Sequence, residues 1–105
     1  MDMPLAIDDF TGSAAEAAEL LRALSTAPRL LVMCHLAASG ELSAGELVER
    51  VGLSQSALSQ HLAKLREQGL VAYRRESQSL RYRVADPKAL RLLRLLHELF
   101  CPGLD

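Results

Sequence analysis

The feature that most restricts how this chain can fold is a short amphipathic segment, Ser54–Arg66, that runs to a glycine and then into two arginine-rich stretches. Leu58, Leu62 and Leu65 recur at positions i, i+4 and i+7, which places them on one stripe of a helix. The other side carries serine, glutamine and lysine. Short hydroxyl and amide side chains suit a helix that approaches base edges in a groove, whereas a helix that is only solvated usually prefers glutamate and lysine. The segment therefore predicts a recognition helix, which Gly69 ends.

Two short segments, Leu70–Arg75 and Leu80–Ala85, follow this helix and are separated by the polar residues 76–79. In the second segment, apolar side chains alternate with arginines, which is the two-residue period of a half-buried strand. The two segments therefore predict a β-hairpin whose outer face is lined with arginine. A hairpin directly behind a recognition helix has the position of a wing.

Helix start signals divide the rest of the chain. Two serines are each followed three positions later by glutamate, the pattern of a capping box, and two prolines stand where a first helical turn would begin. These positions are Ser13 with Glu16, Ser43 with Glu46, Pro28 and Pro87. We expect helices over residues 14–24, 28–38, 44–50 and 87–100 in addition to the recognition helix. The predicted fold is mainly α with a β-hairpin wing, a winged helix-turn-helix of order α-α-α-α-β-β-α.

The 105 residues are expected to form one domain over residues 13–101, with a flexible N-terminal tail over 1–12 and a C-terminal tail over 102–105. Half of the residues are hydrophobic but only 4% are aromatic, and the abundance of Leu and Ala favours helices. No apolar run approaches the length of a membrane span, and the acidic start lacks the basic region of a signal peptide. We therefore expect a cytoplasmic protein with no membrane partner.

The net charge of −1 conceals an uneven distribution. Residues 1–27 carry a net charge of −4, whereas residues 51–85 carry six basic and two acidic side chains, a net charge of +4. A local basic patch on a near-neutral protein is sufficient to dock DNA phosphates, although a solvated face gives the same pattern.

The last expected helix carries leucines on more than one face. A chain of 11.5 kDa cannot readily bury both sides of a terminal helix within itself. We therefore expect a homodimer in which the last helix, together with the first, packs against its twofold-related copy. Burial of the helix within one subunit is the alternative.

The chain resembles the ArsR/SmtB family of winged helix-turn-helix repressors. The resemblance is carried by LSQSALSQHLAKLREQGLV over residues 53–71, by the hairpin exit RRE…LRYRVADP, and by PRLL at residues 28–31. It covers roughly residues 14–101. It implies a homodimer that binds a pseudo-palindromic operator in double-stranded DNA and leaves it when an inducer arrives, with no enzymatic activity, no catalytic residue and no cofactor.

The residue pattern and the resemblance together predict which side chains meet DNA. Glutamine can pair with adenine and serine can contact several bases, whereas wing arginines mainly hold the phosphate backbone or the minor groove. The expected DNA-binding residues are Ser54, Gln55, Ser56, Ser59, Gln60, His61, Lys64, Arg74, Arg75, Arg81 and Arg83. For His61, local capping or packing is the alternative. Two recognition helices related by a dyad would reach successive major grooves.

The metal sites found in some branches of the family are not expected here. One branch has a Cys-x-Cys-type motif at the third helix, where this chain has serine and glycine within residues 41–47. Another builds a zinc site between the last helices from Asp, His and a His-x-x-Glu motif, and here Asp86 and His97 are out of register with such a set. Zinc needs about four correctly placed ligands. Neither His97 nor His35 is therefore expected to bind a metal.

Two cysteines remain, Cys34 in the middle of the second helix and Cys101 at the end of the last. Spacing alone is compatible with two small buried apolar residues. Within LVMCHL and FCP, however, they resemble the pair in the dithiol branch of the family that responds to reactive sulfur species. That resemblance implies a short polysulfide bridge between the two sulfurs of one subunit and a fall in operator affinity. It also implies control of genes for sulfide and persulfide detoxification.

Three alternatives remain open. The same fold could sense a thiophilic ion such as As(III) or Cd(II), although two thiolates usually need a third ligand. A dithiol redox enzyme is the second, but such enzymes commonly use a close Cys-x-x-Cys, and here the thiols are 67 positions apart. The third is a dimerisation module without a DNA function, which predicts no salt-sensitive DNA binding.

Overall fold

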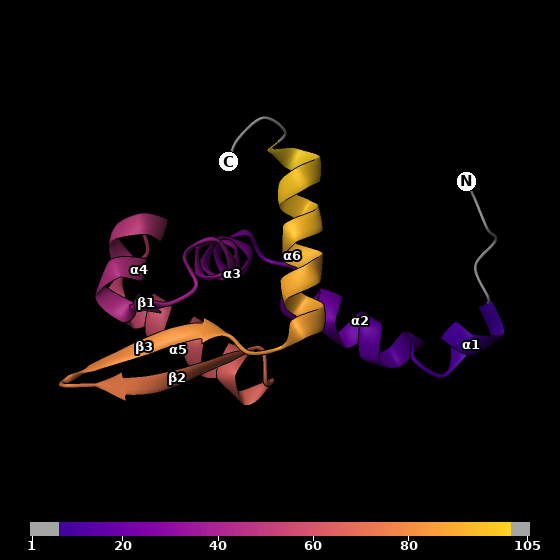
Figure 1. Cartoon of the computed structure of the whole chain (residues 1–105), viewed down its shortest axis with the longest axis horizontal. Helices are drawn as coiled ribbons and strands as arrows, with labels where there is room; N and C mark the ends of the chain where they lie inside the picture. Colours follow the sequence, from indigo (N-terminus) through magenta and orange to yellow (C-terminus); the bar gives the residue numbers. More distant parts are fainter. Residues whose placement is uncertain (1–6, 102–105) are drawn as a thin grey trace.

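The computed structural model describes residues 7–101, and its helices and strands follow the predicted order with two additions. The elements are α1 (Ile7–Thr11), α2 (Ala14–Ala23), α3 (Ala27–Ser39), β1 (Leu42–Ser43), α4 (Ala44–Val51), α5 (Gln55–Glu67), β2 (Val71–Glu76), β3 (Ser79–Val84) and α6 (Pro87–Phe100). Helices α4 and α5 form the helix-turn-helix, and β2 with β3 forms the wing (Figure 1). This confirms the predicted fold class. Within the described range, every helix falls short of the length and apolar character that a membrane span requires.

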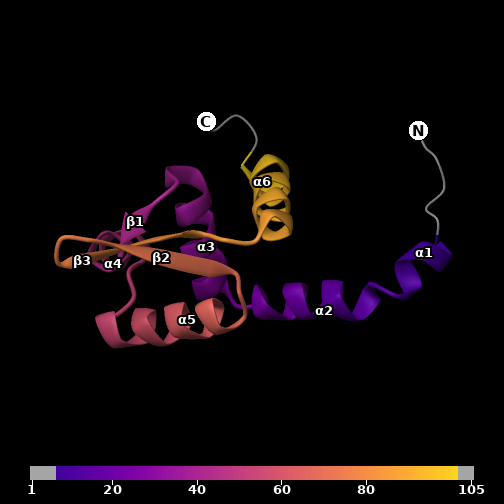
Figure 2. The same ribbon diagram turned by 60° about the horizontal axis from the view of Figure 1, so that its bottom comes forward.

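Helix α3 is the centre of the domain and contacts α4, α6 and β3. In Figure 2, α5 lies along the lower edge, with the hairpin above it and α6 on the opposite side of α3. The fully buried large side chains are Val32, Met33, Leu36, Leu47, Leu58, Leu65 and Leu93. Burial of each such side chain contributes about 2 kcal/mol. These contacts fix the angle at which α5 is held against the rest of the domain.

The sheet is antiparallel, with strand order β1-β3-β2. Tyr73 faces Tyr82 across the hairpin, and their rings meet edge to face with centroids 5.5 Å apart. The turn consists of Ser77 and Gln78, and Ser77 has a φ of +57°, a region that favours glycine. Strand β1 was not predicted because two residues show no periodicity.

Side-chain hydrogen bonds decide which of the two predicted capping boxes forms. The Ser43 hydroxyl accepts from the Glu46 N–H at 3.1 Å, and the Glu46 carboxylate accepts from the Ser43 N–H at 2.8 Å, which confirms the capping box predicted there. The capping box predicted at Ser13 is wrong. Its backbone is helical where a cap is normally extended, it makes no side-chain cap bond, and Glu16 instead accepts from the Lys88 ammonium at 2.9 Å.

Helices α1 and α2 extend away from the body of the domain as an arm (Figures 1 and 2). Helix α1 lies inside the range 1–12 that was expected to be a tail; its five residues are too few to show a helical period. Residues 1–6, and the tail expected over 102–105, lie outside the described residues.

Candidate nucleic-acid interface and dithiol site

Helix α5 has a defined start and end. Gly52 ends α4 in a left-handed conformation with φ of +74°, which costs glycine little. Two residues later the Ser54 hydroxyl accepts a hydrogen bond from the Ala57 N–H at 3.1 Å and caps α5. Gly69, with φ of +76°, turns the chain from α5 into β2. The start and the end of α5 are therefore set by local backbone geometry.

The polar side of α5 faces solvent and its apolar stripe faces the core. Leu58, Leu62 and Leu65 are at most 3% exposed. The exposed side chains on the helix and its cap include Ser54, Gln55, Ser56, Ser59, Gln60 and Lys64. A rigid helix that presents short hydroxyl and amide groups to solvent has the chemistry required to read base edges in a major groove.

His61 differs from these residues because it is half-buried and has a partner in another helix. Its Nδ1 accepts a hydrogen bond from Nε of Arg29 at 3.2 Å. Arg29 lies in the first turn of α3, and the bond therefore connects α3, which carries Cys34, to the predicted recognition helix.

Two wing arginines are engaged in ion pairs within the domain. Arg74 binds the Glu41 carboxylate through two nitrogens, each at 2.9 Å, and Arg81 binds Glu46 at 3.1 Å. The hydrogen bond from Arg74 is the largest cause that lowers the pKa of Glu41, and the hydrogen bond from the Ser43 N–H is the largest cause that lowers the pKa of Glu46. Sequence reasoning missed this network because its partners lie 33 and 35 positions apart.

The strand register divides the four wing arginines between the two faces of the hairpin. Arg74 pairs with Arg81, and Ala72 pairs with Arg83, which places those three arginines on one face. Arg75 pairs with Leu80 and lies on the other face. The arginine-lined face expected from the sequence is therefore present for three of the four arginines, and Arg75 departs from it. Arg75 and Arg83 are exposed, and their side chains make no ion pair or hydrogen bond with residues 7–101.

The wing is also fixed to α5 by an aromatic contact. The Arg66 guanidinium lies 4.5 Å from the centroid of the Tyr73 ring, and Tyr73 packs on Tyr82. Cation–π contacts of this kind contribute about 0.5–1 kcal/mol at exposed sites. This contact joins the end of α5 to the base of the wing.

The two cysteines are free thiols, and both are partly exposed. Cys34 packs against the edge of the core, as do Leu30 and Ala37 of the same helix. Burial is the larger cause that raises the pKa of the Cys34 thiol, and the charge of a Cys101 thiolate raises it further. Cys101 directly follows α6, and Cys34 lies in α3, so the two thiols come from two different helices.

A cavity of about 390 Å³ opens beside Cys34 between α3 and α6. Its walls are Ala37 and Ala38 from α3, and Leu93, Arg94, His97 and Glu98 from α6. This volume lies in the range typical of small-molecule sites. No group of three or more His, Cys, Asp or Glu side chains within the described range is placed to hold a metal ion.

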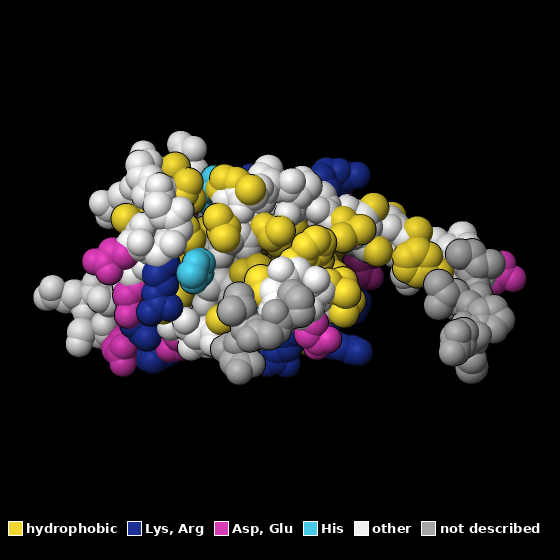
Figure 3. All heavy atoms as spheres, turned by 90° about the horizontal axis from the view of Figure 1, so that it is seen from above, with side chains coloured by type: hydrophobic (Ala, Val, Ile, Leu, Met, Phe, Trp, Pro, Cys, Tyr) yellow, Lys and Arg dark blue, Asp and Glu magenta, His cyan; other side chains and the backbone are white. Residues whose placement is uncertain are grey.

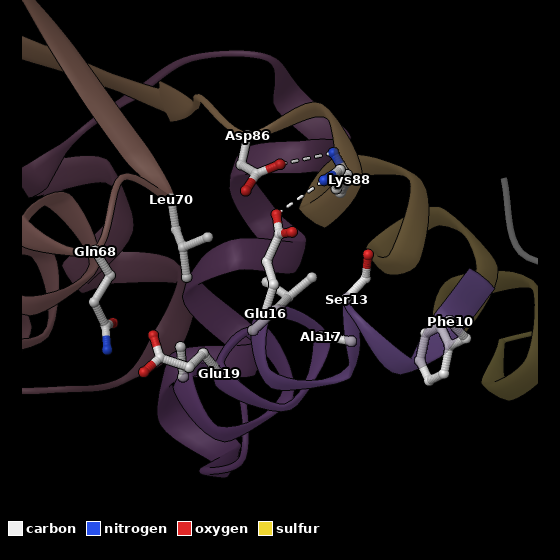
Figure 4. Close-up of a pocket in the computed structure, with 11 residues that line it drawn as sticks. Phe10, Ser13, Glu16, Ala17, Glu19, Gln68, Leu70, Asp86 and Lys88 are labelled. Atoms are coloured by element: carbon white, nitrogen blue, oxygen red, sulfur yellow. Dashed lines mark hydrogen bonds and ion pairs between the residues drawn. The ribbon is translucent and has the colours of Figure 1, made fainter. Parts of the chain in front are cut away.

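A second cavity, of about 430 Å³, lies between α2 and the start of α6 (Figure 4). Glu16 and Lys88 form an ion pair across it at 2.9 Å, and Asp86 accepts from the Lys88 N–H at 2.8 Å. It contains no thiol and no residue of the predicted recognition helix.

Large apolar side chains remain exposed on the arm, on α3 and on α6. Figure 3 shows hydrophobic side chains running from the body of the molecule onto the arm. The exposed ones are Phe10, Leu21, Leu31, Leu95, Leu99 and Phe100, each between 48% and 77% exposed. Contiguous apolar surface on a soluble domain usually marks an interaction site.

Comparison with known proteins agrees with this arrangement. The model of the family described as "Bacterial regulatory protein, arsR family" matches residues 25–73, which include α3, α4 and α5. The transcriptional activator HlyU of Vibrio cholerae is 43% identical over 98 residues, which cover 93% of this chain and 90% of HlyU.

Solved structures extend the similarity to the whole fold. A structure described as reduced HlyU from Vibrio cholerae superposes with a TM-score of 0.83 at 44% identity, covering 89% of this chain and 97% of that one. The transcriptional repressor BigR from Xylella fastidiosa superposes with a TM-score of 0.86 at 39% identity, covering 94% of this chain and all of BigR.

Proposed function

Because the chain belongs to the ArsR family of bacterial regulatory proteins, and is thus a DNA-binding transcriptional regulator, we propose that it is a homodimeric repressor that releases its operator when sulfur joins Cys34 to Cys101. The regulated genes would serve sulfide and persulfide detoxification. The observation that carries the proposal is the pair of free thiols at the junction of α3 and α6, close enough for one charge to raise the pKa of the other.

The DNA-binding part of the proposal uses the exposed side of α5 and the wing. Gln55, Ser56, Ser59 and Gln60 would face base edges, with Ser54 and Lys64 beside them. Arg75 and Arg83 are the wing arginines free to meet phosphate, whereas Arg74 and Arg81 would act mainly by holding the wing against Glu41 and Glu46. His61 would support α5 through Arg29 and contact DNA only with its remaining ring edge.

The sensing chemistry is a transfer of sulfane sulfur from an organic persulfide, RSSH. Each protein thiolate attacks the outer sulfur of one RSSH, which breaks the S–S bond and releases RSH, so both cysteines become persulfides. One protein persulfide then attacks the inner sulfur of the other and expels H₂S, which leaves a trisulfide, Cys34–S–S–S–Cys101. Two protein thiols and two RSSH are thereby converted into one trisulfide, two RSH and one H₂S. In the reducing cytoplasm such a bridge acts as a signal, since structural disulfides are rare there.

The bridge would change DNA binding through α3. It would tie the middle of α3 to the end of α6, and α3 contacts α5 through the bond between Arg29 and His61. A shift of α3 would therefore alter the orientation of α5 in each subunit, and with it the spacing of the two reading helices across the dyad.

The homodimer is supported by the exposed apolar side chains on α2 and α6. Leu21, Leu95 and Leu99 would become buried if these helices packed against a second copy, as the sequence predicts for the first and last helices of the domain. We propose residues 13–101 as the DNA-binding and dimerisation domain.

The test starts from a duplex selected out of a random-sequence library by the reduced protein. Fluorescence anisotropy then measures the affinity for this duplex before and after treatment with glutathione persulfide. We expect the wild-type affinity to fall at least tenfold, and the mass of the intact protein to show a bridge that contains added sulfur. Cys34→Ser and Cys101→Ser should bind the duplex as the wild type does and keep it after treatment. Release of DNA by either serine variant would refute the proposal.

Additional arms of the same assay address the alternatives. As(III) or Cd(II) added to the reduced protein should leave DNA binding unchanged, because within residues 7–101 no group of three or more His, Cys, Asp or Glu side chains is placed to hold a metal ion. Release at stoichiometric metal, without donor, would favour the metal-sensing alternative. Catalytic turnover of peroxide or of a disulfide substrate would favour the enzyme alternative.

A further inference from the structure

The geometry points to a binding site for a carboxylate-bearing organic persulfide in the cavity beside Cys34, with Arg94 as the residue that selects the donor by charge. This inference rests on the proposed function and specifies which sulfur donors the site prefers. The cavity has a volume of about 390 Å³ and holds the Cys34 thiol on one wall and Arg94 with His97 on the other.

Helical spacing brings the relevant side chains of α6 to one side. Arg94, His97, Glu98 and Cys101 lie at positions i, i+3, i+4 and i+7, which share one face of a helix. The second sulfur of the proposed bridge therefore follows the same face that carries the two basic side chains. A donor bound there would lie between Cys34 and Cys101.

Arg94 and His97 are free to bind a ligand. Both are exposed, and neither makes a side-chain hydrogen bond or ion pair with residues 7–101. A guanidinium binds a carboxylate through two parallel hydrogen bonds, and the imidazole adds a donor one turn further along the helix. Of the six residues of α6 and α3 that line the cavity with Cys34, these two alone can carry positive charge.

Glu98 restricts the ligand further. Its carboxylate lies on the same face as Arg94 and would repel a second negative group. It would attract the ammonium of an amino-acid-type donor. A thiol persulfide that carries both a carboxylate and an ammonium therefore fits this wall better than a purely anionic one.

The site stays accessible in the proposed dimer. Leu95 and Leu99, the exposed leucines of α6, lie four positions apart on a different stripe from Arg94 and His97. Packing of the leucine stripe against a second copy would leave the cavity side of α6 facing solvent.

The experiment compares the rate of sulfur transfer from two donors to the reduced full-length protein. Glutathione persulfide carries carboxylates and an ammonium, and the persulfide of 2-mercaptoethanol carries neither. Mass spectrometry follows the bridge in the wild type and in Arg94→Ala, with Arg91→Ala as the matched control because Arg91 is an exposed arginine of α6 outside the cavity. Arg94→Lys tests whether charge alone is sufficient.

We expect Arg94→Ala to lower the rate with glutathione persulfide about fivefold, the effect of one exposed charge pair at its upper limit, and to leave the rate with the neutral donor unchanged. Arg94→Lys should restore part of the rate. The difference between donors should shrink at high salt. Glu98→Gln should slow glutathione persulfide, which carries an ammonium, and accelerate thioglycolate persulfide, which is purely anionic.

Equal losses with both donors, no loss at all in Arg94→Ala, or the same loss in Arg91→Ala would each overturn the donor site while leaving the sensor intact. If the wild-type protein accepts sulfur from neither donor, or if Cys34→Ser still releases DNA, the proposed function itself fails and the donor site fails with it.

Discussion

At the scale of single residues, the surroundings of Cys34 make its thiol accessible to a ligand but lower its reactivity. It lies beside a cavity, but burial and the neighbouring Cys101 both raise the pKa of its thiol. Because the thiolate is the nucleophile, the raised pKa reduces the reactive fraction at neutral pH. A thiol of this kind reacts slowly with general electrophiles, and a donor held in the cavity would compensate by proximity.

The raised pKa predicts a pH profile. Alkylation of Cys34 by iodoacetamide, followed peptide by peptide with mass spectrometry, should keep accelerating above pH 9, the ordinary value for this group. Cys101→Ser should move the midpoint downward, since one of the two causes is removed. A Cys34 midpoint at or below the ordinary value in the wild type would contradict the described environment. The folded state holds this proton more tightly than the unfolded chain, so its contribution to stability is present below pH 9 and is lost as pH rises through the raised pKa.

Arg29 and His61 illustrate a residue pair whose role the sequence did not show. We expect Arg29→Ala to lower the free energy of unfolding by about 1 kcal/mol, the net contribution of one such hydrogen bond. Urea denaturation of Arg29→Ala, His61→Ala and the double variant forms a double-mutant cycle. A coupling energy near zero would show that the bond contributes nothing.

At the scale of elements, ion pairs between arginine and glutamate within the domain hold the wing. Glu41, next to β1, and Glu46, in α4, hold Arg74 and Arg81 of the two wing strands. The network therefore joins the start of the helix-turn-helix to the hairpin. Arg75 and Arg83 form no ion pair with these glutamates, although the charge of Arg83 helps to lower the pKa of Glu41. Arginines that look alike in the sequence therefore have different roles in the structure.

This division predicts different consequences of removing each arginine. Arg75→Ala and Arg83→Ala should weaken DNA binding and lower the slope of log K against log salt by about one each, as expected for a lost phosphate contact. Arg81→Ala should lower the Tm of the free protein instead, because it leaves Glu46 without its arginine partner. Salt titrations followed by anisotropy measure the slope, and thermal melts measure the Tm. Equal slopes in all three variants would contradict the division.

The same network predicts acid sensitivity. Hydrogen bonds and nearby arginines lower the pKa of Glu41 and of Glu46, so their contribution to stability is present above the ordinary glutamate pKa and is lost as pH falls through the lowered values. Urea midpoints measured from neutral to acid pH should fall less steeply in the double variant Glu41→Gln, Glu46→Gln than in the wild type. Parallel curves would show that the network does not respond to pH.

At the scale of the whole molecule, the apolar surface exceeds what a monomer needs. Leu99 is 62% exposed and Leu95 is 48% exposed on a helix whose other side packs on α3. The arm formed by α1 and α2 extends the apolar surface further (Figure 3). A twofold partner would bury this surface and place two copies of α5 at a fixed separation.

Leu99→Glu should therefore convert a dimer into a monomer and abolish tight operator binding, while the fold remains. Sedimentation equilibrium measures the mass, and circular dichroism confirms helix content. Arg94→Glu, an exposed change on the cavity side of the same helix and off the leucine stripe, should leave the dimer intact. A dimer that survives Leu99→Glu would place the interface elsewhere.

Much of the fold could be predicted from the sequence because its signals are local. The leucine period of α5, the Ser43 capping box and the alternation in β3 each depend on neighbours within a few residues. The exposed polar side of α5 follows from the same period. By contrast, α1 and β1 are too short to show a period. The capping box predicted at Ser13 does not form, and Glu16 pairs instead with Lys88, 72 positions away.

The sequence by itself thus determined which segments are helix or strand and which side of α5 is polar, since backbone hydrogen bonds and apolar periodicity act over one or two turns. Only the tertiary structure decided which arginines are free, that His61 is held by Arg29, and that Cys34 faces Arg94 across a cavity. Those contacts join residues more than 30 positions apart, and a pairing between distant charges is set by how the core brings the elements together, which no local pattern encodes.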